Sequence, residues 1–396
     1  MRVAIVHDWL TGMRGGEKCL EVFCEIYPEA DLFTLLHIPG SVSPTIERHT
    51  IHTSPLQYMP GIERRYRYYL PLMPTAVRML DLSGYDFILS SSHCVAKGAR
   101  ADKGAFHLCY CYTPMRYAWS AYDEYFGGGR VSGPVGWILP RIMAYLRNWD
   151  AKASRGVDEF VAISHTVAER IQDSYGRESD VLYPPVDTAR FRPVVKPEDY
   201  YLIVSAFAPY KKVDVAVEAF NRLGRPLKVV GDGQDFDRIK SLGGPNVEFL
   251  GWQDDANLAE LYAGCRAFIF PGVEDFGITP LEAQASGRPV IALGEGGALE
   301  TVVAANREDF APPPGFVDWN EVSGAASEPT GLFFRHPTAD ALVGAVHEFE
   351  RIEDKFRPEA ACRQATLFDR AHFKKTACER FEHGWREYNE RLGALA

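Results

Sequence analysis

Residues 267–293 read AFIFPGVEDFGITPLEAQASGRPVIAL, and this stretch decides the predicted fold. Its first four residues form an apolar run closed by a proline, which is typical of a buried strand. A polar loop follows. We expect Thr279 to cap the N-terminus of the next helix and Gly287 to end that helix. Residues 289–293 are the next apolar run. The stretch therefore predicts a strand, loop, helix and strand of a parallel sheet, with its loop at the edge where open α/β folds bind ligands.

Two carboxylates bracket this loop. Glu274 lies within it, and we expect Glu282 in the first turn of the helix. Backbone amides at a helix N-terminus bind phosphate, and here they are the amides of Phe276, Gly277, Ile278 and Thr279. Carboxylates hold sugar hydroxyls while amides hold phosphate, so the stretch indicates a site for a nucleotide sugar. For either glutamate taken alone, a solvated surface residue is the simpler interpretation.

The composition is that of an ordinary globular protein. The chain has 396 residues, enough for two domains with sizeable cores, and its net charge of −10 argues against general nucleic-acid binding. Its eight cysteines include no CxxC pair, which indicates reduced thiols and no zinc framework. We see no signal peptide and no apolar run long enough to span a bilayer. These features predict a cytoplasmic protein.

Apolar runs that predict strands recur along the chain, with helical patterns between them. They lie at residues 3–6, 85–90, 106–112 and 159–163 in the first half, and at 201–204, 227–230, 247–250, 267–270, 289–293 and 331–334 in the second. Tyr-Pro-Pro-Val-Asp at 183–187 predicts a stiff linker. We therefore expect two doubly wound parallel-sheet domains, 1–188 and 189–371. The aromatic helix predicted within 372–396 is expected to pack back on the first domain.

The first predicted domain carries two candidate binding features. Gly15 and Gly16 follow the first strand and open a helix, which indicates a turn that approaches phosphate. Their spacing does not fit G-x-G-x-x-G, so a dinucleotide cofactor is not indicated, and a simple tight turn is the alternative. His93 follows the second long strand at the same sheet edge. It is a candidate catalytic residue, and a purely structural histidine is an equal alternative.

Residues 59–79 combine arginines with tyrosines at high density. Arg64, Arg65 and Arg67 alternate with aromatic side chains, a pattern that suits a membrane surface or an anionic lipid headgroup. The alternative is a packing helix whose arginines reach out to solvent.

The second predicted domain carries a candidate diphosphate clamp. Lys211 and Lys212 precede a helix, although solvated lysines are the alternative. The acidic pairs at 235/237 and 254/255 fall at predicted helix starts, so we assign no metal. Residues 305–330 form an insertion that we interpret as a lid, an interaction loop or a disordered segment. We also expect a mobile glycine-rich loop at 117–133.

Together these motifs resemble those of the family 4 retaining glycosyltransferases. The signature of two glutamates separated by seven residues is met by Glu274 and Glu282. Supporting motifs are Gly231-Asp232-Gly233, Gly296-Gly297 with Glu300-Thr301-Val302, and Thr330-Gly-Leu-Phe-Phe. Two further motifs are similar to those of bacterial O-antigen and exopolysaccharide mannosyltransferases, namely Thr113-Pro-Met-Arg116-Tyr117 and residues 183–187.

This resemblance implies the GT-B fold, in which two Rossmann-like domains face a central cleft. It implies that Glu282 binds the ribose, that Glu274 and the four amides hold the transferred sugar and its diphosphate, and that Lys211 neutralises the leaving group. Gly16 would approach the diphosphate from the first domain, and Arg116 would face the acceptor. No metal cofactor is implied.

The implied reaction moves mannose from GDP-mannose onto a lipid-linked or glycan acceptor in bacterial polysaccharide assembly, such as that of lipopolysaccharide. It retains the anomeric configuration and takes place at the inner face of the cell membrane.

Two positions depart from the family pattern. Ala206 stands where the family usually has arginine, and Tyr112 stands where it has a histidine near the reacting centre. Lys212 and His93 are candidates to compensate. Three alternatives stay open: a UDP-sugar donor, a partner protein that binds a nucleotide sugar without transfer, and a sugar-nucleotide epimerase of the same architecture.

Overall fold

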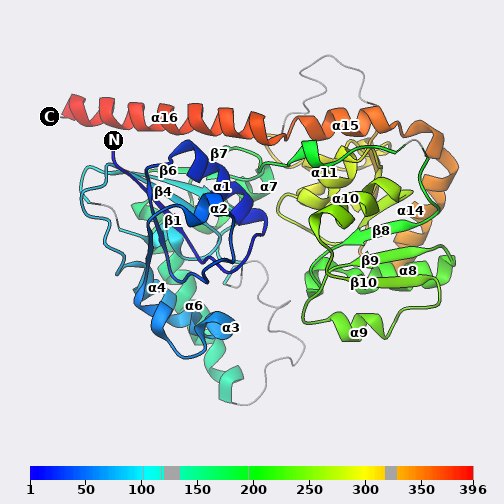
Figure 1. Cartoon of the computed structure of the whole chain (residues 1–396), viewed down its shortest axis with the longest axis horizontal. Coiled ribbons are helices and arrows are strands. Elements are labelled where there is room, and N and C mark those ends of the chain that lie inside the picture. The colour runs from blue at the N-terminus through cyan, green and yellow to red at the C-terminus, as the bar shows by residue number, and fades with distance from the viewer. Residues whose placement is uncertain (101, 117, 120–133, 195, 317–327, 396) are drawn as a thin grey trace. The chain divides into compact units, whose positions relative to one another are not determined.

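The computed structural model describes residues 1–100, 102–116, 118–119, 134–194, 196–316 and 328–395 (Figure 1). The chain forms two compact units. Unit 1 comprises Met1–Pro185 with Phe373–Ala396, and unit 2 comprises Val186–His372. The expected domain ends at 188 and 371 lie close to these limits.

Unit 1 is built on a seven-stranded sheet in the order β3-β2-β1-β4-β5-β6-β7, whose described pairings are all parallel. The strands are β1 Val3–His7, β2 Asp31–Thr34, β3 Ile51–Thr53, β4 Phe87–Ser92, β5 Phe106–Cys111, β6 Glu159–Ala162 and β7 Asp180–Val181. The helices are α1 Gly15–Ile26, α2 Pro44–Glu47, α3 Ile62–Arg65, α4 Met73–Val77, α6 Pro134–Ala153, α7 His165–Tyr175 and α16 Arg370–Leu395. The strand order reverses between β1 and β4, so this sheet has its switch point there.

Unit 2 is built on a six-stranded sheet in the order β10-β9-β8-β11-β12-β13, again parallel in its described pairings. The strands are β8 Tyr201–Val204, β9 Leu227–Val230, β10 Val247–Gly251, β11 Ala267–Phe270, β12 Val290–Leu293 and β13 Gly331–Phe334. The helices are α8 Val213–Leu223, α9 Phe236–Lys240, α10 Asp255–Gly264, α11 Ile278–Ala285, α12 Ala298–Thr301, α14 Ala339–Ile352 and α15 Pro358–Thr366. One buried cluster joins the sheet to α8 and α14, and another joins it to α10, α11 and α15.

The prediction of two parallel α/β domains is confirmed. Every predicted apolar run forms a strand, while the short strands β2, β3 and β7 were not predicted. β4 begins at Phe87 rather than at residue 85, because its pairing with β1 begins where Val3 meets Phe87.

Three local expectations were wrong. Helix α11 begins at Ile278 with Gly277 as its N-cap, so Thr279 is not the cap and Glu282 lies in the second turn. Residues 59–79 do not form one packing helix. They form α3, the 3-10 helix η2 (Tyr66–Leu72) and α4. Pro71 and Pro74 lie on either side of the boundary between η2 and α4, where proline lacks the amide that a continuous helix needs.

Helix α16 packs against unit 1 (Figure 1). Phe373 and Phe381 contact Phe23 of α1, at ring-centroid distances of 5.9 and 5.5 Å. Tyr388 donates a hydrogen bond to the carbonyl oxygen of Ala105, 3.2 Å away. Within the described ranges, no helix combines the length and hydropathy needed to cross a bilayer.

Most of the loop expected at 117–133 and the central part of the insertion expected at 305–330 lie outside the described residues.

Candidate functional site

The switch point of the unit 2 sheet brings two predicted residues together. β8 and β11 are adjacent strands, and the loops after them carry Lys211 and Glu274. The Nζ atom of Lys211 forms an ion pair with Oε1 of Glu274. The two side chains are 13% and 23% exposed, so each remains accessible to a ligand. The two loops touch, because a Cβ atom at Gly272 would lie 2.7 Å from the carbonyl oxygen of Tyr210.

Lys212 has an unusual backbone conformation. It is the N-cap of α8 and has φ of +53°, in the left-handed region that a residue with a Cβ atom rarely occupies. Such a conformation costs about 1 kcal/mol and often marks a functional loop.

Gly296 and Gly297 pack against the backbone of the loop that precedes α11 and carries the predicted phosphate-binding amides. Gly277 adopts φ of +99°, and Phe276 before it is buried. The amide of Gly297 donates to the carbonyl oxygen of Glu274 over 2.8 Å. A Cβ atom at Gly297 would lie only 2.2 Å from the carbonyl oxygen of Phe276. The Gly296-Gly297 motif therefore supports the loop by close backbone packing.

Glu282 is buried, with 6% of the residue exposed, so the interpretation as a solvated glutamate is wrong. The hydroxyl of Tyr262, from α10, donates to its Oε2 atom over 2.9 Å. Burial, and then the Glu282 carboxylate, raise the pKa of Tyr262 well above its ordinary value, so this donor stays protonated. Sequence reasoning missed Tyr262, because nothing in the local pattern distinguishes it from a core aromatic residue.

The Gly231-Asp232-Gly233 turn packs against the loop that follows β8. Gly231 has φ of +129°, and a Cβ atom there would lie 1.9 Å from the carbonyl oxygen of Ser205. Asp232 is exposed, and its Oδ1 atom accepts the amide of Gly233 over 2.7 Å. The glycines are therefore required by the close contact between the two loops.

The carboxyl edge of the unit 1 sheet gathers a second set of predicted residues. Gly15 begins α1, and the carbonyl oxygen of Gly16 accepts a hydrogen bond from the Tyr112 hydroxyl over 2.9 Å. The Oγ atom of Ser91 lies 2.9 Å from the Tyr112 hydroxyl oxygen and 2.9 Å from Nδ1 of His7. Burial raises the pKa of Tyr112 well above its ordinary value, so it acts here as a neutral hydrogen-bonding group.

His93 stands at the same edge beside Asp8, which sequence reasoning did not single out. Nδ1 of His93 lies 3.1 Å from Oδ2 of Asp8. Asp8 follows a strand, as many ligand-binding residues of parallel sheets do, and that position was the available signal.

The predicted acceptor and membrane residues lie elsewhere in unit 1. Arg64, Arg65 and Arg67 are exposed on α3 and η2, and Arg116 is half-buried after β5.

The acidic pairs of unit 2 lie at helix starts: Asp235 is the N-cap of α9, and Asp254 is the N-cap of α10 and accepts the amide of Asn257. The part of the chain that the structure describes holds no group of three or more His, Cys, Asp or Glu arranged to hold a metal ion.

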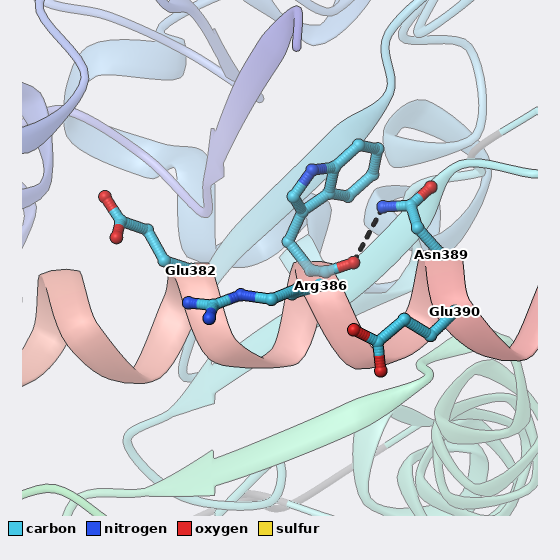
Figure 2. Close-up of a pocket in the computed structure, with 5 residues that line it drawn as sticks. Glu382, Arg386, Asn389 and Glu390 are labelled. Atoms are coloured by element: carbon cyan, nitrogen blue, oxygen red, sulfur yellow. Dashed lines mark hydrogen bonds between the residues drawn. The ribbon is translucent and has the colours of Figure 1, made fainter.

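An open hollow lies along α16, lined by Glu382, Trp385, Arg386, Asn389 and Glu390 (Figure 2). Its side chains come from one helix, and Asn389 donates to the carbonyl oxygen of Trp385 over 2.7 Å. It contains none of the predicted site residues.

Two family models match the chain. Residues 187–361 match the glycosyl transferases group 1, and residues 23–190 match glycosyltransferase family 4. The O-antigen chain mannosyltransferase C of Escherichia coli is 28% identical over 208 residues, which are 49% of this chain and 50% of that protein. A GDP-mannose-dependent monoacylated alpha-(1-6)-phosphatidylinositol monomannoside mannosyltransferase of Corynebacterium glutamicum is 31% identical over 205 residues, 43% of this chain and 52% of that protein. The chain spans about half the length of the curated relatives it matches.

Solved structures agree with these matches at the level of the fold. Sucrose-phosphate synthase of Thermosynechococcus elongatus superposes with a TM-score of 0.68 at 16% identity, covering 100% of both chains. Anabaena Alr3699/HepE in complex with UDP superposes with a TM-score of 0.65 at 14% identity, covering 97% of this chain and 100% of that one. The chain therefore belongs to the family 4 glycosyltransferases and has their GT-B fold of two parallel-sheet α/β domains.

Proposed function

We propose that the protein is a retaining mannosyltransferase that moves mannose from GDP-mannose onto a glycan or lipid-linked acceptor. The observation that carries this proposal is the Lys211–Glu274 ion pair at the unit 2 switch point, together with buried Glu282. The relatives named as mannosyltransferases, one of them GDP-mannose-dependent, support the choice of donor.

The ion pair suits a donor that carries both a diphosphate and sugar hydroxyls. When the diphosphate binds Lys211, it replaces the Glu274 carboxylate, which is then free to accept hydrogen bonds from the sugar. The amides of residues 276–279 add uncharged donors for the phosphate oxygens. Glu282, held by Tyr262, is placed to accept the ribose hydroxyls.

The same groups act on the reaction. Negative charge grows on the diphosphate as the bond to the sugar breaks, and Lys211 and the helix amides stabilise it. The acceptor hydroxyl attacks from the face that the diphosphate leaves, so the configuration is retained. An oxygen of the departing phosphate takes the acceptor proton, and no protein base is required.

Two variants test the role of the ion pair. Lys211→Ala should lower turnover about 10²–10³-fold, the range seen when one group that stabilises a transition-state charge is removed. Glu274→Ala should also lower turnover, because the transferred sugar loses its hydrogen-bond acceptor. Glu218→Ala is the matched control, since it breaks the exposed Glu218–Arg222 pair on α8 and should leave turnover unchanged. Wild-type turnover in both site variants would contradict the proposal.

A thermal-shift panel with GDP, UDP, ADP and their sugar conjugates tests the donor, without added metal. Selective stabilisation by GDP and GDP-mannose is expected. Stabilisation by UDP and its sugar conjugate alone would mean that the donor is a UDP-sugar and not GDP-mannose. The UDP arm is included because a HepE structure contains UDP. Stabilisation by a nucleotide sugar without product would favour a non-catalytic partner, the alternative raised by Ala206 and Tyr112.

We also propose that unit 1 docks on an anionic lipid surface that carries the acceptor. Exposed side chains form what we call the arginine–tyrosine surface: Tyr58, Arg64, Arg65, Arg67, Tyr68, Leu72, Arg78 and Met79. Tyr58 and Tyr68 are 86% and 83% exposed, and Leu72 and Met79 are 49% and 59% exposed. The whole chain has a net charge of −10, yet this surface combines four arginines with exposed apolar side chains. That combination suits an anionic lipid interface.

Vesicles of phosphatidylcholine with and without phosphatidylglycerol test this surface. The triple variant Arg64→Ala/Arg65→Ala/Arg67→Ala should bind the anionic vesicles roughly a hundredfold more weakly, at about 1 kcal/mol for each arginine. The control removes three exposed arginines of unit 2, Arg335, Arg351 and Arg357, and should bind as the wild type does. Equal binding by the two triple variants would reject the surface.

A further inference from the structure

Asp8 is a fully buried carboxylate with an unusual number of donors. Its Oδ2 atom accepts the amides of His93 and Cys94 over 2.7 and 2.9 Å, and its Oδ1 atom accepts those of Val95 and Ala96 over 2.6 and 2.8 Å. Burial by itself raises the pKa of Asp8, but His93, His7 and the amides together lower it below the ordinary value. Asp8 is therefore ionised and acts only as an acceptor.

The ionised carboxylate sets the tautomer of His93. Nδ1 of His93 lies 3.1 Å from Oδ2 of Asp8. We infer that this nitrogen carries the proton, because an unprotonated nitrogen would repel the carboxylate oxygen at that distance. Burial lowers the pKa of His93 below the ordinary histidine value, against the opposite effect of Asp8, so the ring is neutral at neutral pH. Its Nε2 atom is then an unprotonated acceptor, on the ring edge that faces away from Asp8.

His93 is the member of this cluster that reaches the surface. The side chain of His93 is 29% exposed and that of Asp8 is 0% exposed. The residues Tyr112, Trp9 and His7 as a whole are 9%, 4% and 1% exposed. Trp9 meets the His93 ring edge-on at a centroid distance of 4.5 Å, and the centroids of His7 and Tyr112 lie 6.2 and 6.3 Å away. The cluster lies at the carboxyl ends of the neighbouring strands β1 and β4, at the switch point of the sheet, which is the ligand-binding position of doubly wound sheets.

We propose that Asp8 and His93 form a dyad in which Nε2 of His93 accepts a hydrogen bond from a sugar hydroxyl of the donor or the acceptor. His93 touches the ligand, and Asp8 is a positioning residue that holds the ring and its tautomer. No proton is transferred by the dyad. This inference rests on the proposed function, since it assigns a hydroxyl ligand to unit 1 of a glycosyltransferase.

The dyad predicts a pH dependence for substrate binding. The charged groups that act on His93 are Asp8, Glu17 and Lys97, and the titratable ring of His7 lies beside it. When the ring gains a second proton, Nε2 becomes a donor and the bond to the hydroxyl is lost. The KM that depends on this bond should be constant at neutral pH and rise only when the pH falls below the ordinary pKa of histidine.

Kinetics of His93 variants test the contact and identify the hydroxyl. His93→Ala should raise one KM about tenfold, as expected for one lost hydrogen bond to a neutral group. A higher KM for the nucleotide sugar places the hydroxyl on the donor, and a higher KM for the acceptor places it there. His93→Gln should recover part of the loss, because the amide oxygen is also an acceptor. His52→Ala is the control, since His52 is also paired with an aspartate. His52 lies on the edge strand β3, and its Nε2 atom is 3.6 Å from Oδ1 of Asp31 on β2.

Nitrogen-15 NMR of the imidazole rings tests the role of Asp8 without any turnover. The wild-type His93 ring should be protonated at Nδ1 and not at Nε2 at neutral pH. In Asp8→Asn the negative charge that favours a proton on Nδ1 is removed, so the tautomer protonated at Nε2 should gain population.

Two results would overturn the dyad, provided that the wild type is active. The first is that both KM values of His93→Ala differ from those of the wild type by less than about twofold. The second is that the His93 ring of the wild type is protonated at Nε2. A wild type that turns over no nucleotide sugar would instead reject the proposed function.

Discussion

At the scale of single residues, unit 1 is tied together by a buried ion pair. Nζ of Lys97 lies 2.7 Å from Oδ1 of Asp150, and both side chains are 0% exposed. Lys97 also donates to the carbonyl oxygen of Cys94, while Asp150 accepts from Trp119 and Tyr175 over 2.9 and 2.6 Å. Burial lowers the pKa of Lys97, but the Asp150 carboxylate raises it above its ordinary value on balance. The pair therefore joins α6 to the segment that follows His93.

Removing one charge of this pair should be costly. We expect Lys97→Met to lower the free energy of unfolding by about 3–5 kcal/mol, because a carboxylate is left buried without its cation. Lys97→Met/Asp150→Asn should recover part of this loss, since the asparagine amide is uncharged and keeps an acceptor for Trp119 and Tyr175. Urea unfolding at neutral pH measures both variants. A single variant that is as stable as the double variant would show that the buried charge is not the cause.

At the scale of elements, α16 completes the core of unit 1. Its buried residues Phe373, Ala377, Phe381 and Gly384 recur at the spacing of one helix face. A Cβ atom at Gly384 would lie 3.0 Å from Cζ of Phe106, so the helix packs closely on the sheet at that point.

Phe381 is the residue of choice to test this packing. It is 0% exposed, and Phe381→Ala should lower the stability of unit 1 by about 3–5 kcal/mol through lost burial and the cavity left behind. Leu392→Ala is the control on the same helix, because Leu392 is 39% exposed and its removal should cost less than about 0.5 kcal/mol. The measurement is urea unfolding followed by tryptophan fluorescence. Equal losses of unfolding free energy in the two variants would mean that the buried face of α16 does not stabilise unit 1.

At the scale of the whole molecule, stability should fall as the medium becomes acidic. His107 is fully buried, its Nε2 atom lies 2.8 Å from Ser90 Oγ, and burial lowers its pKa from 6.5 to about 4. The unfolded chain therefore binds a proton before the folded chain does, so the stabilising effect is complete above pH 6.5 and is lost as the pH falls towards 4. The pKa values of Asp8, Glu17 and His93 are lowered as well, so these groups act in the same direction.

The contribution of His107 to the free energy of unfolding is on the order of 3 kcal/mol, because each tenfold loss of proton affinity on folding is equivalent to about 1.4 kcal/mol. Urea unfolding between neutral pH and pH 4 measures it, and His107→Gln should flatten the profile while the exposed control His336→Gln does not. All four groups belong to unit 1, and His107 and His93 lose their effect at a higher pH than any carboxylate does, so unit 1 should lose stability first as the pH falls. A profile that is identical in wild type and His107→Gln would contradict this assignment.

The sequence by itself determined the two-domain α/β architecture and the positions of the chemistry-bearing loops. Strands buried on both faces are near-continuous apolar runs, which the local pattern reveals. β2, β3 and β7 escaped prediction because they are short and two of them are partly exposed. Glycines and prolines likewise marked the turns that follow the strands, so the loop holding Glu274 was found before any contact was known.

Only the tertiary structure decided which side chains meet. Lys211 pairs with Glu274 because β8 and β11 are neighbours in the sheet, and Tyr262 reaches Glu282 because α10 packs beside α11. Asp8 meets His93 because β1 pairs with β4 across a gap of more than eighty residues. Local periodicity records which faces are buried, but strand order is set by the packing of the whole sheet, so contacts across it are not visible in the sequence.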